Sequence, residues 1–405
     1  MQMKSFRSPL AASVTALAGL ALVVGCTPLP DAPPVDGDFA PTISYFKPAT
    51  TPGTSPALVT LTWSVDDVNG DDVTCTIDVD GDDAAEFTIN SCQDTGSRNV
   101  TLSAVDGLST QHTLTLTATD GVEIDGVVRV VKQDMTVTIA PGPTEPFDIS
   151  LVGIDELAPD VAATFATAAA RWQQVITAGL PDVDGSTLGC TAPDGEPLPS
   201  DIDDLVIYVK VEPIDGPGSV LGSAGPTCML MSTELGIAGQ MTFDSADIAT
   251  MQSKGTFGSV ILHEMGHVLG IGTLWDTSWA SGSRHLLTGA GGINPRFVGA
   301  AASSEWGLLG GISTVPVENT GGPGTADSHW RENVFTTELM TGWMNSGAQM
   351  SAMTIASLAD MGYHVDMSAA DPFILGAGVS DGIAGRGSNV VEDSLTMLRP
   401  PLQVG

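Results

Sequence analysis

Two histidines four positions apart stand near the middle of the chain, in the segment HEMGHVLG from His263 to Gly270. On an α-helix, side chains at this spacing lie on one face, one turn above the other, so both imidazoles can reach the same metal ion. Glu264 lies beside that position, where its carboxylate can take a proton from a metal-activated water. The opposite side of the helix is apolar and is expected to be buried: Ile261, Leu262, Met265, Val268 and Leu269. The segment therefore predicts a helix with two ligands of a catalytic zinc site.

The first residues have the pattern of a bacterial secretion signal. Two basic residues precede an apolar run from Leu10 to Val24, and small residues lead into Cys26. This pattern predicts a lipoprotein signal peptide over residues 1–25, with Cys26 as the lipidation site. An ordinary signal peptide or a single membrane-spanning helix are the alternatives, although the run is short for a span. Thr27 after the cysteine favours the outer membrane, so we expect a lipid-anchored protein of the bacterial cell envelope, at the outer membrane or cell surface.

Composition limits the partners and the compartment. Residues 26–38 are rich in proline and aspartate, as expected of a solvated tether. The net charge of -34 argues against binding to nucleic acid or docking on anionic lipid. The four remaining cysteines are expected to form two local disulfides, Cys75–Cys92 and Cys190–Cys228, in an oxidising compartment. Free thiols are the alternative.

Between residues 39 and 140, apolar and polar residues alternate with a period of two, for example from Val59 to Val65. Short alternating runs separated by turn residues are typical of an all-β sandwich of immunoglobulin type. The acidic turns at residues 66–72 and 78–83 carry carboxylates that are possible calcium ligands. Neither turn has EF-hand spacing, and solvated hairpin turns are the preferred interpretation.

The pattern changes after a Pro-Gly-Pro sequence at residues 141–143. An alanine-rich segment that begins at Pro159 has apolar residues at helical spacing. Apolar runs at residues 205–209 and 241–243 follow and are interpreted as buried strands. This order of helix, strands and metal-binding helix predicts an α+β domain over residues 147–370. Residues 371–405 would form a C-terminal extension that packs on this domain or trails from it.

A catalytic zinc site needs a third protein ligand and an open position for water. Metzincin peptidases take this ligand from a histidine three residues after the glycine that ends the helix, but here Gly270 is followed by Thr273 at that position. The candidates further along the chain are His285, His329 and His364. His285 lies in a Ser- and Gly-rich loop and is expected to be exposed, whereas His364 follows a helix end.

The surroundings of His329 favour it as the third ligand. A glycine-rich segment precedes it, and Met340 follows eleven residues later. This arrangement resembles that of metzincins, in which a methionine in a turn forms an apolar floor under the three imidazoles. The resemblance implies His263, His267 and His329 as zinc ligands and Met340 as the floor. A plain core methionine is the alternative for Met340.

Residues 147–365 resemble the leishmanolysin family of zinc metallopeptidases within the metzincins. Three segments carry the resemblance in order: HEMGHVLGIGTLW at His263, SHWRENVFTTELMTG at Ser328 and SAMTIASLADMGY at Ser351. The family has a long insertion before the third histidine, and here His329 lies 62 positions after His267. In the third segment, a helix is expected with Ser351 as its N-cap and a glycine as its stop.

The resemblance implies a metalloendopeptidase that hydrolyses protein or peptide substrates with a zinc-activated water. Glu264 would be the general base, and Gly270 would form the turn that ends the helix. The chain departs from the pattern in two respects, because no cysteine-containing propeptide is recognised and Gly342 stands where some metzincins have a tyrosine ligand. The alternatives are an inactive surface adhesion or binding lipoprotein, and a structural zinc site with a fourth protein ligand.

Overall fold

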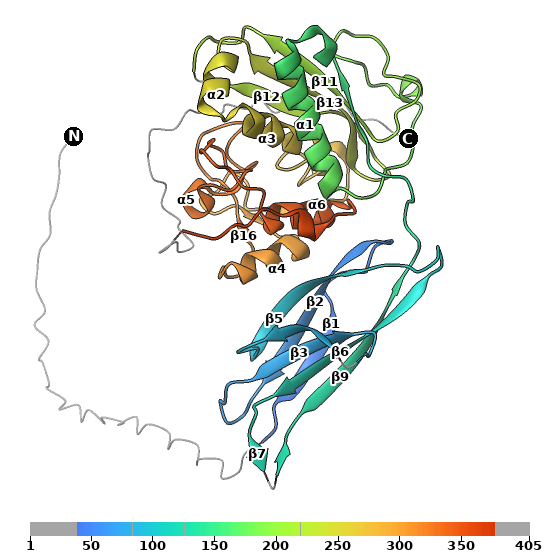
Figure 1. The fold of residues 1–405 in the computed structure, drawn as a ribbon, viewed down its shortest axis with the longest axis vertical. Helices are drawn as coiled ribbons and strands as arrows, with labels where there is room; N and C mark the ends of the chain where they lie inside the picture. Colours follow the sequence, from blue (N-terminus) through green and yellow to red (C-terminus); the bar gives the residue numbers. More distant parts are fainter. Residues whose placement is uncertain (1–38, 83, 125, 219, 377–405) are drawn as a thin grey trace, which may run out of the picture. The chain divides into compact units, whose positions relative to one another are not determined.

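The computed structural model describes residues 39–376, except residues 83, 125 and 219 (Figure 1). The predicted signal peptide, Cys26, the tether and residues 377–405 of the C-terminal extension lie outside the described residues. Within the described part, no helix combines the length and apolar character needed to cross a bilayer.

The strands of the first hundred described residues form two antiparallel sheets around one apolar core. One sheet has the order β1 (Thr42–Pro48), β2 (Ala57–Asp66), β5 (Asp94–Leu102). The other has the order β4 (Ala85–Ile89), β3 (Thr74–Val79), β6 (Thr110–Thr119), β9 (Val131–Ile139), and a small hairpin joins β7 (Glu123–Ile124) to β8 (Val127–Val128). Alternate residues of β2, β3 and β6 enter the core, as their period of two predicts. The immunoglobulin type of this β-sandwich stays a prediction.

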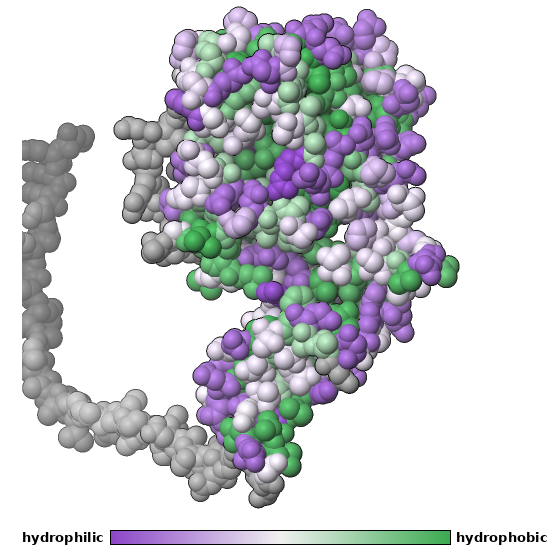
Figure 2. All heavy atoms as spheres, in the orientation of Figure 1, coloured by the Kyte–Doolittle hydropathy of each residue, from purple (hydrophilic) through white to green (hydrophobic). Residues whose placement is uncertain are grey.

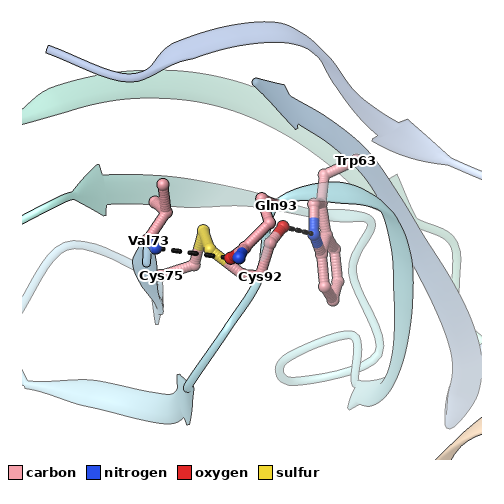
Figure 3. Close-up of a disulfide and its surroundings, with 5 residues drawn as sticks. All are labelled: Trp63, Val73, Cys75, Cys92 and Gln93. Atoms are coloured by element: carbon pink, nitrogen blue, oxygen red, sulfur yellow. Dashed lines mark hydrogen bonds between the residues drawn. A yellow bond between two sulfur atoms is a disulfide. The ribbon is translucent and has the colours of Figure 1, made fainter. Parts of the chain in front are cut away.

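A disulfide between Cys75 and Cys92 lies inside this core (Figure 3). The indole Nε1 of Trp63 donates a hydrogen bond of 3.3 Å to the carbonyl oxygen of Cys92. A Cβ atom at Gly96, opposite on β5, would lie 2.4 Å from Cζ2 of Trp63. Glycine at this position therefore leaves the space that the buried indole occupies.

In the acidic turns of the sandwich, the carboxylates accept hydrogen bonds from nearby backbone N–H groups. Asp67 Oδ1 accepts hydrogen bonds from three successive backbone N–H groups, at residues 69–71. Asp78, Asp82 and Glu86 bring carboxylate oxygens within 4.8 Å of one another, but Asp82 and Glu86 are exposed and each carboxylate accepts a backbone N–H. These bonds are those of solvated turns, and the structure does not support calcium binding.

The second part of the chain has a four-stranded mixed sheet. Its order is β10 (Ile149–Val152), β11 (Leu205–Glu212), β13 (Leu235–Asp244), β12 (Gly222–Leu230), with only β12 antiparallel to its neighbour. Helices α1 (Pro159–Val175) and α3 (Phe257–Val268) pack against each other and against this sheet, as Figure 1 shows. The apolar residues of α1 at helical spacing all enter the core: Val161, Phe165, Ala168, Trp172 and Val175. This mixture of sheet and helices is the α+β class expected for the domain.

Glycines in β13 let α3 approach the sheet closely. A Cβ atom at Gly239 would lie 2.3 Å from Cγ1 of Val268, and one at Gly236 would lie 3.2 Å from the carbonyl oxygen of Val268. Trp172 on α1 holds the other side of α3, because its Nε1 donates to the Leu262 carbonyl oxygen at 2.9 Å. The second disulfide, Cys190–Cys228, joins the segment before β11 to β12.

The insertion between α3 and His329 is rich in glycine and serine but contains short regular elements. It contains a three-stranded sheet, β14 (Leu287–Thr288), β15 (Arg296–Phe297) and β16 (Val315–Pro316), and the helix α4 (Ala300–Leu308). Its buried side chains Phe297, Trp306 and Val315 belong to the main core, so the insertion has no separate core among the described residues. The remaining elements are α2 (Ile248–Lys254), α5 (Glu332–Phe335), α6 (Ala352–Met361) and 3₁₀ turns η1 (Ile154–Glu156), η2 (Gly185–Thr187), η3 (Ser278–Ala280) and η4 (Met367–Ala369).

Charged side chains lie mainly on the surface of the described part. Figure 2 shows hydrophilic residues spread over most of the visible face, in keeping with the net charge of -34. A few charged side chains are buried: Asp204, Asp244, Asp247, Glu264, Glu318, Arg331 and Glu338. Burial of a charge is costly without partners, so these residues indicate where the fold has a specific polar arrangement. Two of them, Glu264 and Glu338, lie in the segments that form the candidate site.

Candidate metal centre

Three imidazoles from distant parts of the chain converge in the core of the second domain. The Nε2 atom of His267 lies 3.0 Å from Nε2 of His263 and 3.0 Å from Nε2 of His329, and the remaining pair is 3.3 Å apart. A tetrahedral zinc ion with Zn–N bonds of about 2.0–2.1 Å holds its ligand nitrogens about 3.3 Å from one another. The spacing of the three nitrogens therefore fits one zinc ion.

The hydrogen bonds of the rings leave their Nε2 lone pairs directed at one another. Each Nδ1 lies at hydrogen-bond distance from a backbone carbonyl oxygen: His263 from Leu339 (2.8 Å), His267 from Ile271 (2.8 Å) and His329 from Thr325 (3.0 Å). A carbonyl oxygen only accepts, so each Nδ1 carries the proton and each neutral ring presents an Nε2 lone pair. Three converging lone pairs repel one another unless a cation lies between them. The donor set thus fits a metal ion as well as the spacing does.

Burial keeps the rings of His267 and His329 in the neutral form that a metal requires. It lowers the pKa of His329 to about 3, with a further lowering by the neighbouring His263. Burial also lowers the pKa of His267 well below its usual value, and the two neighbouring histidines add to the effect. Because zinc binds the neutral imidazole, the environment favours ligation over protonation.

Helix α3 carries two of these histidines and is largely buried, its polar residues included, although Leu262 of the predicted apolar side is only partly buried. His263 and His267 are 1% exposed, and Glu264 between them is completely buried. The helix ends at Gly270, whose φ of 111° is a left-handed conformation that favours glycine. Thr273, which stands where shorter metzincin motifs have their third histidine, donates from Oγ1 to the His267 carbonyl oxygen at 2.7 Å. It therefore caps the helix end instead of contributing a ligand.

A close backbone approach brings the His329 segment to the end of α3. Gly272 has a φ of 75°, and a Cβ atom there would lie only 1.9 Å from the carbonyl oxygen of Ser328. The pattern of the sequence did not single out this glycine. The sequence feature that could have indicated it is the pair Gly270 and Gly272 on either side of one apolar residue, because closely spaced glycines often mark backbone conformations that other residues rarely adopt.

Gly272→Ala is expected to weaken zinc binding, because the new methyl group would displace the backbone next to His329. Gly291→Ala is the matched control, because Gly291 lies in the same insertion with a φ of 72° and has open space around its Cβ position. The control should be destabilised by only about 1 kcal/mol, the cost of placing alanine in a left-handed backbone conformation. Zinc affinity and thermal unfolding of both variants test this. Equal behaviour of the two would show that the close approach is unimportant.

Met340 packs against helix α3 at Gly266, and its role as a floor under the histidines stays a prediction. It is completely buried, and a Cβ atom at Gly266 would lie 2.8 Å from its Sδ atom. Gly266 sits between the two histidines of α3, so its lack of a side chain allows the methionine to approach the helix. At Gly342 a Cβ atom would lie 2.4 Å from Cγ2 of Thr325, so a tyrosine ligand does not fit there.

The other histidines among the described residues lie elsewhere. The His285 ring is exposed, and its Nδ1 is 3.5 Å from Asp276 Oδ2. His364 donates from Nδ1 to the Pro56 carbonyl oxygen at 2.9 Å. His112 lies in the β-sandwich, with Nδ1 2.8 Å from Asp80 Oδ2. Within the described part, no fourth His, Cys, Asp or Glu joins the group of three ligands.

Two polar residues anchor the insertion that leads to His329. The Glu234 carboxylate accepts hydrogen bonds from Ser283 N (2.7 Å), Ser283 Oγ (2.7 Å), Arg284 N (3.0 Å) and the Thr277 hydroxyl. The Arg284 guanidinium donates to backbone carbonyl oxygens on three segments, at Thr233, Leu274 and Met361. Partial burial by itself raises the pKa of Glu234, but the hydrogen bonds prevail and lower that pKa to about 2.

Glu234→Gln is expected to reduce the acid sensitivity of the protein. A folded-state pKa of about 2, below the ordinary value of 4.5, means that the ionised carboxylate adds stability above pH 4.5 that is lost as the pH falls toward 2. The variant lacks this contribution at every pH. Thermal unfolding between pH 6 and 2 should therefore show a shallower loss in Glu234→Gln than in the unchanged protein. Parallel curves would contradict the assignment.

Three converging histidines, two of them four positions apart on one buried helix, form a candidate metal centre in this domain. Residues 199–388 match the family model described as Leishmanolysin. A protein named "Leishmanolysin homolog" from Crithidia fasciculata is 30% identical over 168 residues, which cover 40% of this chain and 24% of that relative. This domain is therefore leishmanolysin-like. The matched region spans about a quarter of the relative's length, and the family model begins after the β-sandwich.

Proposed function

We propose that this protein is a zinc-dependent metalloendopeptidase of leishmanolysin type. The observation that carries the proposal is the convergence of three Nε2 lone pairs within 3.0–3.3 Å of one another, next to a buried glutamate on the same helix. His263, His267 and His329 are the proposed ligands. Protein or peptide chains are the proposed substrates, in keeping with the leishmanolysin-like domain.

The residues of the site have separate tasks in peptide hydrolysis. Zinc, when bound, supplies a Lewis acid that polarises the scissile carbonyl and lowers the pKa of a water molecule. Glu264 takes the proton of the attacking water and then delivers it to the leaving nitrogen. Complete burial excludes bulk water from its carboxylate, which favours proton transfer over exchange with solvent. Met340 and Gly266 keep the floor of the site apolar and the imidazoles in place.

The alternatives have less support. A structural zinc site requires a fourth protein ligand, and the described residues offer none within the group. An inactive adhesion lipoprotein would not need a buried glutamate beside three ligands. We favour the active peptidase on both points.

The proposed location is the bacterial cell envelope, with lipid on Cys26 anchoring the protein at the outer membrane or cell surface. The support is the sequence pattern of the first 26 residues, together with the two disulfides that an extracytoplasmic protein can form. The β-sandwich, proposed to be immunoglobulin-like, would stand between this anchor and the peptidase domain in the chain.

Digestion of casein or gelatin by the purified protein tests the proposed function. We expect cleavage that a zinc chelator abolishes and that added zinc restores. Glu264→Ala protein, prepared identically, controls for contaminating peptidases. A protein that contains zinc and cleaves neither substrate would instead support the binding protein.

A further inference from the structure

A second buried glutamate stands in the segment that carries Met340. Glu338 is 2% exposed and stands two residues before Met340. Its carboxylate accepts hydrogen bonds from the methionine turn and from the start of helix α6. The proposed hydrolysis does not use this group, so its burial needs another explanation.

The two carboxylate oxygens of Glu338 join the methionine turn to helix α6. Oε2 accepts the backbone N–H of Met340 at 2.6 Å. Oε1 accepts the backbone N–H of Ser351 at 3.1 Å, the Ser351 hydroxyl at 2.7 Å and the Thr354 hydroxyl. Ser351 is the N-cap of α6, where the helix dipole favours a negative charge. The carboxylate therefore holds the turn against the end of a buried helix.

The methionine turn, which Glu338 holds, carries backbone groups that orient His263 and the His329 segment. Leu339, between Glu338 and Met340, has the carbonyl oxygen that accepts from Nδ1 of His263. The carbonyl oxygen of Met340 accepts the backbone N–H of Trp330, the residue after His329, at 2.9 Å. The indole of Trp330 also donates to Thr354 Oγ1 at 2.8 Å. A movement of the turn would therefore disturb both His263 and the His329 segment.

We propose that Glu338 is a positioning residue, whose carboxylate fixes the methionine turn and so sets the tautomer and direction of the His263 ring for zinc binding. The inference rests on the metal centre of the proposed function, but it concerns metal affinity and does not require peptidase activity. Hydrogen bonds behind ligating histidines commonly determine metal affinity, with losses of about 10- to 100-fold when they are removed.

Glutamine cannot replace the carboxylate, although it has the same shape. The N–H groups of Met340 and Ser351 are fixed backbone donors on opposite oxygens of Glu338. A glutamine has one acceptor oxygen, so its NH₂ group must face one of these donors in either orientation. In Glu338→Gln the turn is thus expected to shift away from one of its two attachments.

Asp360→Asn is a matched control from the other end of α6. The Asp360 carboxylate also accepts two fixed backbone N–H groups, with Oδ1 2.9 Å from Ala301 N and Oδ2 2.9 Å from Ala302 N. These bonds attach α6 to α4 and involve neither the methionine turn nor a ligand. Both substitutions should therefore lower the unfolding temperature of the metal-depleted protein, but only Glu338→Gln should weaken zinc affinity.

The experiment measures zinc affinity of the full protein by competition with a chromophoric chelator, together with unfolding of the metal-depleted form. We expect Glu338→Gln to weaken zinc binding about 10- to 100-fold, whereas Asp360→Asn stays within about 3-fold of the unchanged protein. Unchanged affinity in Glu338→Gln, or an equal loss in both variants, would overturn the proposal. If Glu338→Gln does not fold, Thr354→Val replaces it, because this variant removes one donor to the Glu338 carboxylate. We then expect several-fold weaker zinc binding. Unchanged zinc affinity in Thr354→Val would refute the role of Glu338.

These outcomes separate the inference from the proposed function. If the unchanged protein binds zinc tightly but cleaves no peptide, the endopeptidase assignment fails while the role of Glu338 can still be measured. If the unchanged protein binds no zinc, the metal centre itself is refuted, and the role of Glu338 with it.

Discussion

Glu264→Ala is expected to bind one zinc ion per molecule and to have lost peptide hydrolysis. The three imidazoles are held by backbone carbonyl oxygens at residues 271, 325 and 339, so backbone groups fix their orientation in this variant too. The proton acceptor for the attacking water is absent in this variant. General acid–base catalysis contributes about 10²- to 10⁴-fold to rates, and a loss of at least that size is predicted. Metal analysis and peptide cleavage on the same sample test this.

Glu305→Gln controls for the loss of a largely enclosed glutamate elsewhere in the domain. Glu305 lies on α4, and its Oε1 accepts from Asn99 Nδ2 at 2.8 Å, remote in sequence from the zinc helix. This variant should keep its zinc and its activity. Full activity in Glu264→Ala would remove the general-base assignment, whereas loss of zinc from it would indicate that the glutamate supports the fold of the site.

His329→Ala is expected to lose both zinc and activity. The two histidines that remain on α3 offer only two of the three ligands that a catalytic zinc ion requires. The loss of affinity should exceed the about 10- to 100-fold cost of changing a group behind a ligand. Zinc content after dialysis, and peptide cleavage with added zinc, measure the two effects.

Two histidines that contribute no ligand provide the controls. His285→Ala removes an exposed ring beside Asp276, and His364→Ala removes a ring that bonds to the Pro56 carbonyl oxygen. Both variants should bind zinc normally. Normal zinc content in His329→Ala, together with a deficit in His285→Ala, would reverse the assignment of the third ligand.

Patterns of neighbouring residues were sufficient to predict several individual strands and helices. The alternation from Val59 to Val65 corresponds to β2, and the helical spacing after Pro159 corresponds to α1. The N-cap at Ser351 and the stop at Gly362 match the ends of α6. Each of these features depends on neighbouring residues, so the printed sequence contains the whole signal.

Long-range contacts were not predictable in the same way. In the sequence, Gly239 only lowers the strand propensity of its segment. The structure shows that Val268 occupies the space that a side chain at Gly239 would take. Glu338 reads as an ordinary polar residue beside an apolar pair. Its partners Ser351 and Thr354 lie 13 and 16 residues further along the chain. Because the pairing depends on the packing of α6, no local pattern could indicate that this carboxylate is buried.

The insertion shows the same limit. Its Gly- and Ser-rich composition predicts loops, yet it contains a small sheet and the helix α4. The buried guanidinium of Arg331 donates to the Val317 carbonyl oxygen at 2.9 Å and to the Pro295 carbonyl oxygen at 3.1 Å, which ties the insertion to the segment after His329. These strands are two residues long and are stabilised by the main core, so their own sequence has little period to detect.

X-ray absorption at the zinc edge of the purified protein, compared with a crystal structure of the same sample, shows whether the three imidazoles share one metal ion. We expect one zinc ion with three histidine nitrogens at about 2.0–2.1 Å and one oxygen from a water molecule. Three imidazoles that share no metal, or a zinc ion whose fourth ligand comes from the protein, would contradict this expectation.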